Sequence, residues 1–257
     1  MLDRVLIAKV CMLAGKIMLE SGAETYRVED TMNRIASAYG LTNAQSYATP
    51  TGINFSADFA DVTNFIRISD RSNNLQKIDD VNSISRSITA GDIDINQALV
   101  LLDNIDGAKN TYSKLVQIVA AAFLSGSFTI MFGGTWPDFL PSFIAGGTGY
   151  AAMLGAGRLI AISFVADFFG SFVLGVLAVT FIAFGFGIDL DRIIIGAVMP
   201  LVPGLHITNA VRDLMAGHLV SGMSKGVEAG LTAFAIGTGI AIVPVTAWAM
   251  LLGGGPL

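Results

Sequence analysis

The sequence predicts a mainly α-helical membrane protein: a cytoplasmic α+β domain at residues 1–112, then a bundle of five transmembrane helices at residues 113–257. Composition supports this, because 53% of the 257 residues are hydrophobic and 14% are charged, whereas an average soluble domain has about 25% charged residues. The charge is also uneven. Beyond Lys114, Lys and Arg occur only as Arg158, Arg192, Arg212 and Lys225.

The first 112 residues carry the periodicities of a small α+β domain. Apolar residues at helical spacing predict two amphipathic helices, the first on Leu2, Leu6, Val10, Leu13 and Ile17, and the second on Val28, Met32, Ile35 and Tyr39. Alternation in GINFS (52–56) and TNFIRIS (63–69) predicts short strands beside a turn at Pro50-Thr51-Gly52. Residues 78–88 and 96–105 return to a helical pattern.

Five apolar segments follow this domain. A spanning helix needs about 20 mostly apolar residues, and the candidate segments are residues 115–134, 139–157, 162–185, 193–207 and 227–252. Positive residues of short loops mark the cytoplasmic side. Lys109, Lys114, Arg158, Arg212 and Lys225 fall on one side of the predicted spans, and Arg192 falls on the other. The N-terminal domain is therefore expected in the cytoplasm and the C-terminus outside a bacterial inner membrane.

The fourth predicted span is interrupted. Pro200, Pro203 and Gly204 stand where an apolar helix would run unbroken, and proline removes a backbone donor and clashes with the preceding turn. Broken helices at membrane depth are tolerated where they are buried in protein or line a wet cavity, and transporters use them to hold solutes. The break is thus a candidate solute-binding element.

Polar residues follow the break directly. Asn209 is three residues before Arg212 and four before Asp213, so the three are expected on one helix face. Arg212 could seat a carboxylate, and Asn209 with Asp213 an amine or a hydroxyl. The competing interpretation is a proline kink followed by an interfacial Arg–Asp ion pair. The candidate substrate-binding residues are Pro200, Pro203, Gly204, His206, Asn209, Arg212 and Asp213.

Two carboxylates are predicted at membrane depth, where an ionisable group is costly and commonly functional. Asp167 lies inside the third predicted span, and Glu228 begins the fifth. Either one is a proton-coupling residue or a group with a structural partner. The two histidines, His206 and His218, have no cluster of carboxylates or cysteines around them, so no metal site is expected.

Other function classes are disfavoured by the sequence. A net charge of −5 with no basic run argues against a nucleic-acid partner, and no nucleophile elbow or phosphate-binding glycine loop is present. We therefore expect no catalytic residues, no cofactor and no enzymatic activity. The alternative to transport is a membrane-anchored enzyme or small-molecule sensor that acts through the N-terminal domain.

Three stretches carry a family resemblance: SGAETYRVEDTM (21–32), ATPTGINFS (48–56) and PLVPGLHITNAVRDLMAGHLVSGMSKG (200–226). Together they resemble the N-terminal half of the bacterial threonine/serine exporter family. The family includes fused chains of about ten spans and systems split into a long subunit like this chain and a short membrane-embedded one, one such system being associated with succinate export. The resemblance implies an exporter subunit for threonine, serine or a dicarboxylate such as succinate. Because the sequence has no ATP-binding signature, transport would use a gradient or simple facilitation, and the proton gradient is the expected driving force. It also implies a short five-span partner subunit and a possible homo-oligomer of the pair.

Overall fold

The computed structural model describes residues 4–108, 112–160 and 162–251. The chain divides into two compact units. The first comprises Met1–Thr111 and Leu205–Gly226, and the second comprises Tyr112–Gly204 and Val227–Leu257. Leu2 of the first predicted helix, Lys109 and the end of the fifth predicted span lie outside the described residues.

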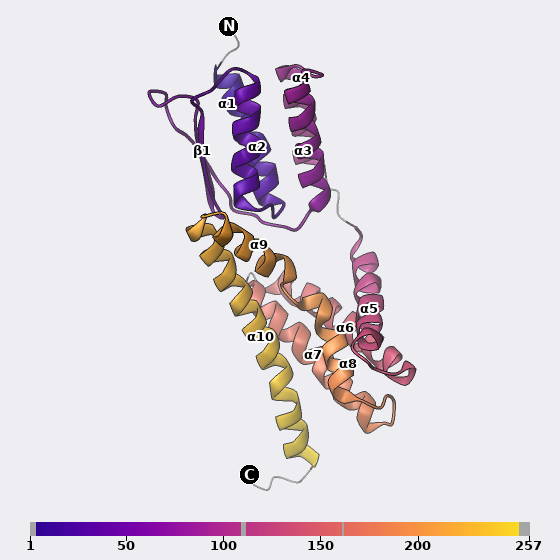
Figure 1. The fold of residues 1–257 in the computed structure, drawn as a ribbon. Helices are drawn as coiled ribbons and strands as arrows, with labels where there is room; N and C mark the ends of the chain where they lie inside the picture. Colours follow the sequence, from indigo (N-terminus) through magenta and orange to yellow (C-terminus); the bar gives the residue numbers. More distant parts are fainter. Residues whose placement is uncertain (1–3, 109–111, 161, 252–257) are drawn as a thin grey trace. The chain divides into compact units, whose positions relative to one another are not determined.

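The first unit has three layers, with a helical hairpin in the middle (Figure 1). The hairpin of α1 and α2 packs against a three-stranded sheet through α1–β2 and α2–β1 contacts, and against α3 and α4 on its other side. Helix α9 and the first turns of α10 complete the unit. The elements are α1 (Arg4–Glu20), α2 (Thr25–Ala38), β1 (Gln45–Thr49), β2 (Gly52–Ser56), β3 (Asn64–Arg67), α3 (Leu75–Ala90), α4 (Ile95–Gly107), α9 (Gly204–Met215) and α10 (Leu219–Leu251).

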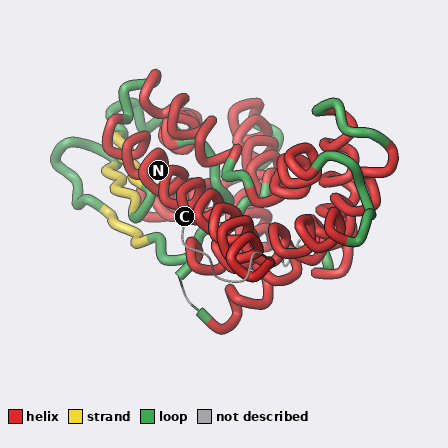
Figure 2. The backbone as a smooth tube through the Cα atoms, turned by 90° about the horizontal axis from the view of Figure 1, so that it is seen from below, coloured by secondary structure: helices red, strands yellow, loops and turns green. Residues whose placement is uncertain are grey.

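The core of this unit follows the predicted periodicity. Val10 and Ile17 of α1 and Val28 and Met32 of α2 are almost fully buried, because residues three and four apart lie on one helix face. The predicted sheet is also confirmed. Its order is β1-β2-β3 with antiparallel pairing, and Figure 2 shows the strands as one small yellow group. Ile53 on β2 points into the core, as period-2 alternation requires.

The second unit is a helical bundle in which α6 lies between α5 and α7. Its elements are α5 (Lys114–Met131), α6 (Trp136–Leu159), α7 (Ser163–Ala183), α8 (Leu190–Val198), the short 3₁₀ helix η1 (Met199–Leu201) and the rest of α10. Small residues allow close approach of the helices. Gly146 of α6 faces Ser125 of α5 and the carbonyl of Ala197 in α8.

Buried hydroxyl groups join the same three helices. Ser125, Thr129 and Ser142 are fully buried. The Thr129 hydroxyl donates to the Ser142 hydroxyl at 2.6 Å, and the Ser125 hydroxyl donates to the carbonyl oxygen of Ala197 at 3.3 Å. Every one of these hydroxyls therefore has a partner, which a buried polar group needs to avoid a desolvation penalty.

Three described helices are long and apolar enough to cross a membrane: α5, α7 and α10. A fourth span is obtained if α8 and η1 are joined to α9, which is bent away from them at the intervening break. The sequence predicts five spans, and the difference is α6. Its 24 residues are long enough, but prolines, glycines and Asp138 lower its hydropathy. The buried face of α6 is made mainly of small and polar residues, among them Ser142, Gly146 and Gly147, which pack closely against the neighbouring helices.

The predicted break in the fourth span is confirmed. Helix α8 ends at Val198, η1 contains Pro200, and α9 begins at Gly204. Val202 between them is extended, with φ −61° and ψ 127°, which is the conformation that a following proline favours. The backbone therefore leaves the helical path at Val202-Pro203 for the reason that the sequence suggests.

The close packing of α6 can be tested with two alanine substitutions on that helix. A methyl group at Gly146 would overlap the Ser125 side chain and lie 3.0 Å from the Ala197 carbonyl oxygen, whereas a methyl at Gly155 meets nothing within 4 Å. We expect Gly146→Ala to lower stability by about 1–3 kcal/mol through overpacking. Gly155→Ala should be neutral or stabilising by up to about 1 kcal/mol. Melting temperatures of the purified variants in one detergent check this; equal values for the two would contradict the packing.

Candidate functional site

The candidate site lies in the first unit, where the turn between α1 and α2 meets α9 and the start of α10. Helix α1 ends in a tight turn in which the amide of Ala23 donates to the Met18 carbonyl at 3.0 Å. Gly22 has φ +86° there, and a Cβ would lie 2.8 Å from the Asn73 side-chain oxygen and 3.0 Å from the Ser72 carbonyl oxygen. Only glycine fits both the backbone conformation and the space.

Asn209 of α9 is anchored to this turn. Its side-chain amide donates to the Gly22 carbonyl oxygen at 2.9 Å. A turn carbonyl that has no helical partner thus receives one from a residue 187 positions away. Asn209 is half-buried, and this contact fixes the rotation of α9 against the turn.

Asp213 lies one turn further along α9 and is fully buried. Its carboxylate accepts from the Thr25 amide at 2.8 Å and from the Thr25 hydroxyl at 3.0 Å. Thr25 is the first residue of α2, so the carboxylate satisfies a backbone N–H at the positive end of that helix. Asp213 therefore serves as a cap that is supplied from a distant part of the chain.

Lys225 on α10 provides the countercharge. Its ammonium group donates to Asp213 at 2.7 Å, to the Ala23 carbonyl oxygen at 3.2 Å and to the Thr25 hydroxyl at 3.3 Å. The residue is 8% exposed. Buried charges persist only where they are paired and hydrogen-bonded, and both members of this pair are.

Glu24 forms a second ionic group beside the first. Its carboxylate is paired with Arg212 of α9 and with Arg27 of α2, the latter at 3.1 Å. Burial by itself raises the pKa of Glu24. Hydrogen bonds from its own backbone and from Arg212, together with the charge of Arg27, outweigh burial and lower that pKa. Glu24 therefore stays ionised at neutral pH. We call Glu24, Arg27, Arg212, Asp213 and Lys225 the charged cluster.

A third contact closes the junction between α9 and α10. Gly217 has φ +86°, and the amide of His218 donates to the Asp213 carbonyl oxygen at 2.9 Å. The His218 imidazole lies 3.7 Å from Glu29 of α2, which also accepts from the Ala48 amide of β1 at 2.8 Å. Burial, with a smaller contribution from Asp213, raises the pKa of Glu29.

The structure brings together three of the predicted site residues. Asn209, Arg212 and Asp213 share one face of α9, as their spacing predicts, and all three contact the α1–α2 turn. Arg212 pairs with Glu24 and Asp213 with Lys225, so the ion pair is not the Arg212–Asp213 pair of the competing interpretation. Whether these residues also contact a solute stays a prediction.

The remaining predicted residues lie elsewhere on the described elements. Pro200 is in η1, Pro203 precedes α9, and Gly204 begins it. His206 is half-buried on α9. Asp167 on α7 and Glu228 on α10 are also half-buried, and each interacts with other groups.

Local sequence patterns do not identify Glu24, Thr25 and Lys225 as members of this site. The pattern of α2 places Glu24 on its polar side, which predicts solvent exposure, whereas Glu24 is 5% exposed. A signal was present nonetheless. The stretches 21–32 and 200–226, which both carry the family resemblance, are the two that meet in the charged cluster.

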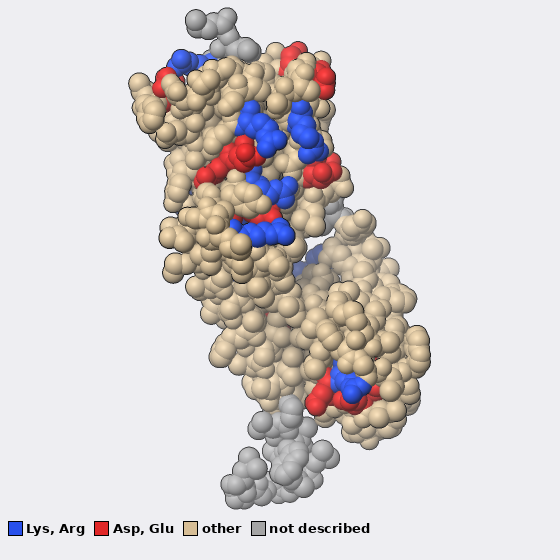
Figure 3. All heavy atoms as spheres, viewed as in Figure 1, with Lys and Arg blue, Asp and Glu red and all other residues tan. Residues whose placement is uncertain are grey.

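In the face drawn in Figure 3, charged side chains gather mainly on the first unit, and fewer are visible on the second. In the second unit Asp138 is fully buried. It accepts from the amide and hydroxyl of Thr135 and from the amides of Ile188 and Asp189. These bonds tie the α5–α6 turn to the α7–α8 loop, which is a structural role.

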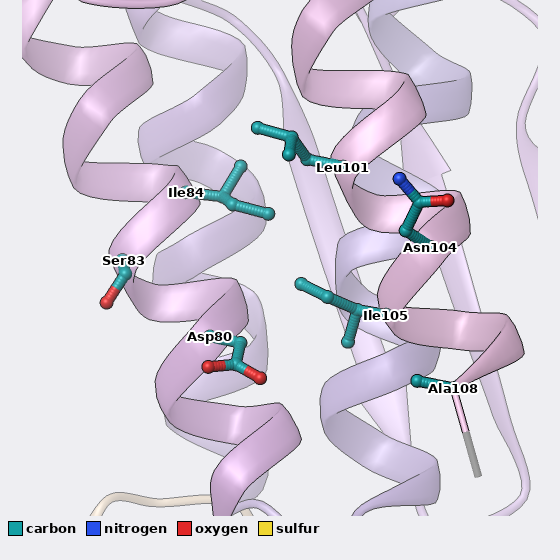
Figure 4. A pocket seen from close by; sticks show the side chains of 7 residues that line it. All are labelled: Asp80, Ser83, Ile84, Leu101, Asn104, Ile105 and Ala108. Carbon is teal, nitrogen blue, oxygen red and sulfur yellow. The ribbon is translucent and has the colours of Figure 1, made fainter. Parts of the chain in front are cut away.

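An open groove of about 360 Å³ runs between α3 and α4. Figure 4 shows Ile84, Leu101 and Ile105 pointing toward one another across it. Asp80 on its wall accepts a hydrogen bond from Gln76. The groove is therefore an apolar seam between two helices, without the converging polar groups of a metabolite site.

The known proteins that this chain resembles are described as exporters or as transporter subunits. A sequence model of the family described as "Putative threonine/serine exporter" matches residues 9–246. The Probable threonine/serine exporter of Mycobacterium tuberculosis is 23% identical over 217 residues, which are 82% of this chain and 40% of that protein. The Threonine/serine exporter of Corynebacterium glutamicum is 24% identical over 223 residues, 83% of this chain and 46% of that protein. The chain thus spans less than half the length of these two relatives.

A different relative matches end to end. The Probable succinate transporter subunit YjjP of Escherichia coli is 23% identical over 250 residues, which are 95% of each chain. No solved structure gives a significant match.

Removing Lys225 tests the buried ion pair. We expect Lys225→Met to destabilise the protein by about 3–5 kcal/mol, because it leaves the Asp213 carboxylate buried without a countercharge. Adding Asp213→Asn removes that charge and keeps an acceptor oxygen for the Thr25 amide, so the double variant should recover part of the loss. Thermal unfolding of the purified proteins measures both. Arg34→Met, which breaks an exposed pair with Asp30, should change stability by less than about 1 kcal/mol. If the double variant lost as much stability as the Lys225→Met and Asp213→Asn variants added together, the pairing of Lys225 with Asp213 would be contradicted.

The lowered pKa of Glu24 predicts a pH dependence. A carboxyl whose pKa is lowered by folding contributes stability above its unfolded pKa of about 4.3, and the contribution is lost as the pH falls through the lower folded pKa. Glu24→Gln should therefore melt below wild type at pH 7, and the gap should close in acid below pH ~4. Melting temperatures from pH 7 downward check this; a gap that persists unchanged in acid would contradict it.

Proposed function

The chain belongs to the threonine/serine exporter family, and on that premise we propose that it is one subunit of a secondary exporter for small carboxylate-bearing metabolites. The solute is threonine, serine or a dicarboxylate of the succinate type, and the proton gradient drives its export. As a member of this family with several apolar helices, the chain is a multi-pass inner-membrane protein.

The observation that carries the proposal is the broken apolar segment followed directly by an exposed arginine. The helix is interrupted at Val202-Pro203, and Arg212 comes two turns later with 60% of its side chain exposed. Backbone groups freed at such a break and a guanidinium with spare donors are both suited to a carboxylate. The residues proposed to form the solute site, by contact or by positioning, are Pro200, Pro203, Gly204, His206, Asn209, Arg212 and Asp213.

The contacts in the charged cluster separate the residues that position α9 from the residue that contacts the solute. Asp213 is fully buried and Asn209 donates to the Gly22 carbonyl, so both hold α9 in place and orient its exposed neighbour. Arg212 donates one N–H group to Glu24, and its other donors have no hydrogen-bond partner among the described residues. Arg212 is therefore the residue that contacts the solute carboxylate. Asp167 and Glu228, half-buried on apolar helices, are proposed to carry the coupled proton.

A second polypeptide completes the exporter in this proposal. The chain aligns with less than half of the two threonine/serine exporters but with 95% of a protein named as a transporter subunit. We propose a short five-span membrane subunit as the partner, with possible further association of the pair. This chain would supply five spans, α6 included, with residues 1–112 in the cytoplasm and the C-terminus outside, because positive loop residues favour the cytoplasmic side.

Efflux tests the proposal. In cells that also express the partner, Arg212→Ala should reduce efflux of preloaded succinate or threonine to background while the protein still reaches the membrane, because the carboxylate loses its charged partner. Arg34→Ala is the matched control, since Arg34 is exposed on α2 and paired with Asp30, and it should export normally. Undiminished efflux by Arg212→Ala would remove Arg212 from the solute path, and no efflux of either solute by wild type would refute the proposed function.

A further inference from the structure

One carboxylate in the charged cluster is shared by two arginines. Arg212 pairs with Oε1 of Glu24, and Arg27 pairs with Oε2 at 3.1 Å. Glu24 is 5% exposed, so it is held in place while each of its oxygens orients one guanidinium. Two positive charges meet one negative charge at this point, which leaves one positive charge in excess.

The neighbouring carboxylates are directed to other partners and form no ion pair with Arg27 or Arg212 among the described residues. Asp213 is fully buried and engaged by Lys225 and Thr25. Glu29 is directed to the Ala48 amide and to His218. Among the described residues, Glu24 is the carboxylate that each of the two guanidinium groups contacts.

The two arginines also reach solvent. The side chain of Arg212 is 60% exposed and that of Arg27 is 39% exposed. A guanidinium has five N–H donors in a planar fork, and each of these arginines donates one of them to Glu24. Further donors on both remain for an anion, and the fork matches the two oxygens of a carboxylate.

We propose that Arg27 and Arg212 together bind one carboxylate of the exported solute, and that this site prefers a dicarboxylate to a zwitterionic α-amino acid. The proposal rests on the proposed function in taking the exported solute as the ligand. It adds Arg27 to the site and chooses between the two solute classes.

The preference follows from charge. In an α-amino acid the ammonium group is bonded to the carbon next to the carboxylate, so it would lie close to both guanidinium groups and be repelled. The carboxylates that could receive it, Glu24 and Asp213, are already engaged. In succinate the second carboxylate is further along the chain and adds no positive charge, so the site discriminates by repulsion of the wrong ligand.

Binding of succinate to the purified full-length chain in neutral detergent, followed by calorimetry, tests the proposal. Arg27→Gln should weaken binding by about tenfold to a hundredfold, as loss of a charge-assisted hydrogen bond predicts. Arg27→Lys keeps the positive charge but lacks the planar fork of donors, so its affinity for succinate should lie between those of wild type and Arg27→Gln. Arg34→Gln, on the same helix with its own partner Asp30, should bind like wild type. Melting temperatures confirm that each variant is folded.

Two further ligands test whether the site needs a carboxylate and whether it rejects an ammonium group. Succinamide, which is uncharged and of similar shape, should not compete, and L-threonine should bind at least about tenfold more weakly than succinate. Equal binding of succinate by Arg27→Gln, competition by succinamide, or equal affinity for L-threonine would each overturn the proposal. Displacement of succinate by phosphatidylglycerol vesicles at a low lipid concentration would also overturn it, since the two arginines would then bind a lipid headgroup.

Efflux by cells that contain the partner separates this proposal from the proposed function. If the pair exports succinate with the same apparent KM in wild type and Arg27→Gln, the site is wrong and the function stands. A raised KM with an unchanged maximal rate supports the site. If wild type exports neither succinate nor threonine, the function fails, and calorimetry alone decides whether the arginines bind a carboxylate.

Discussion

The Asp213 carboxylate, withdrawn from water, joins two parts of the chain that lie 188 positions apart. It caps the first turn of α2 through Thr25 and is neutralised by Lys225. Placing a charge in such a position costs several kcal/mol unless every partner is in place. The placement of α9 and α10 within the first unit depends on this requirement, because the α1–α2 turn, α9 and the start of α10 must each supply a group at one point.

The polar face of α9 is explained by that contact. After the break at Val202-Pro203 the helix carries Asn209, Arg212 and Asp213 on one face, and this face is matched by the Gly22 carbonyl, Glu24 and Thr25. Ionisable groups beside an apolar segment are tolerated because each has a partner within the protein. Arg212 differs from the other two in remaining largely exposed.

In the second unit, small residues hold the helices together. Among helices rich in apolar side chains there is little hydrophobic drive for association in lipid, so close backbone contact and buried hydroxyl groups take its place. Gly146 against Ser125, and Thr129 against Ser142, show both devices in α5 and α6. Asp138 at the start of α6 is likewise buried with its partners supplied by the protein, the amides of Ile188 and Asp189 and the amide and hydroxyl of Thr135.

The sequence by itself determined the elements that depend on local pattern. Helical spacing identified α1 and α2, alternation identified the sheet, and Pro203 identified the break, because periodicity and proline sterics act over a few residues. The shared face of Asn209, Arg212 and Asp213 was likewise readable from their spacing. Only the tertiary structure decided what this face meets. That Glu24 is buried, that Lys225 neutralises Asp213 and that Arg27 joins Arg212 depend on contacts between residues far apart in the chain, and no local pattern specifies which distant helix supplies a countercharge.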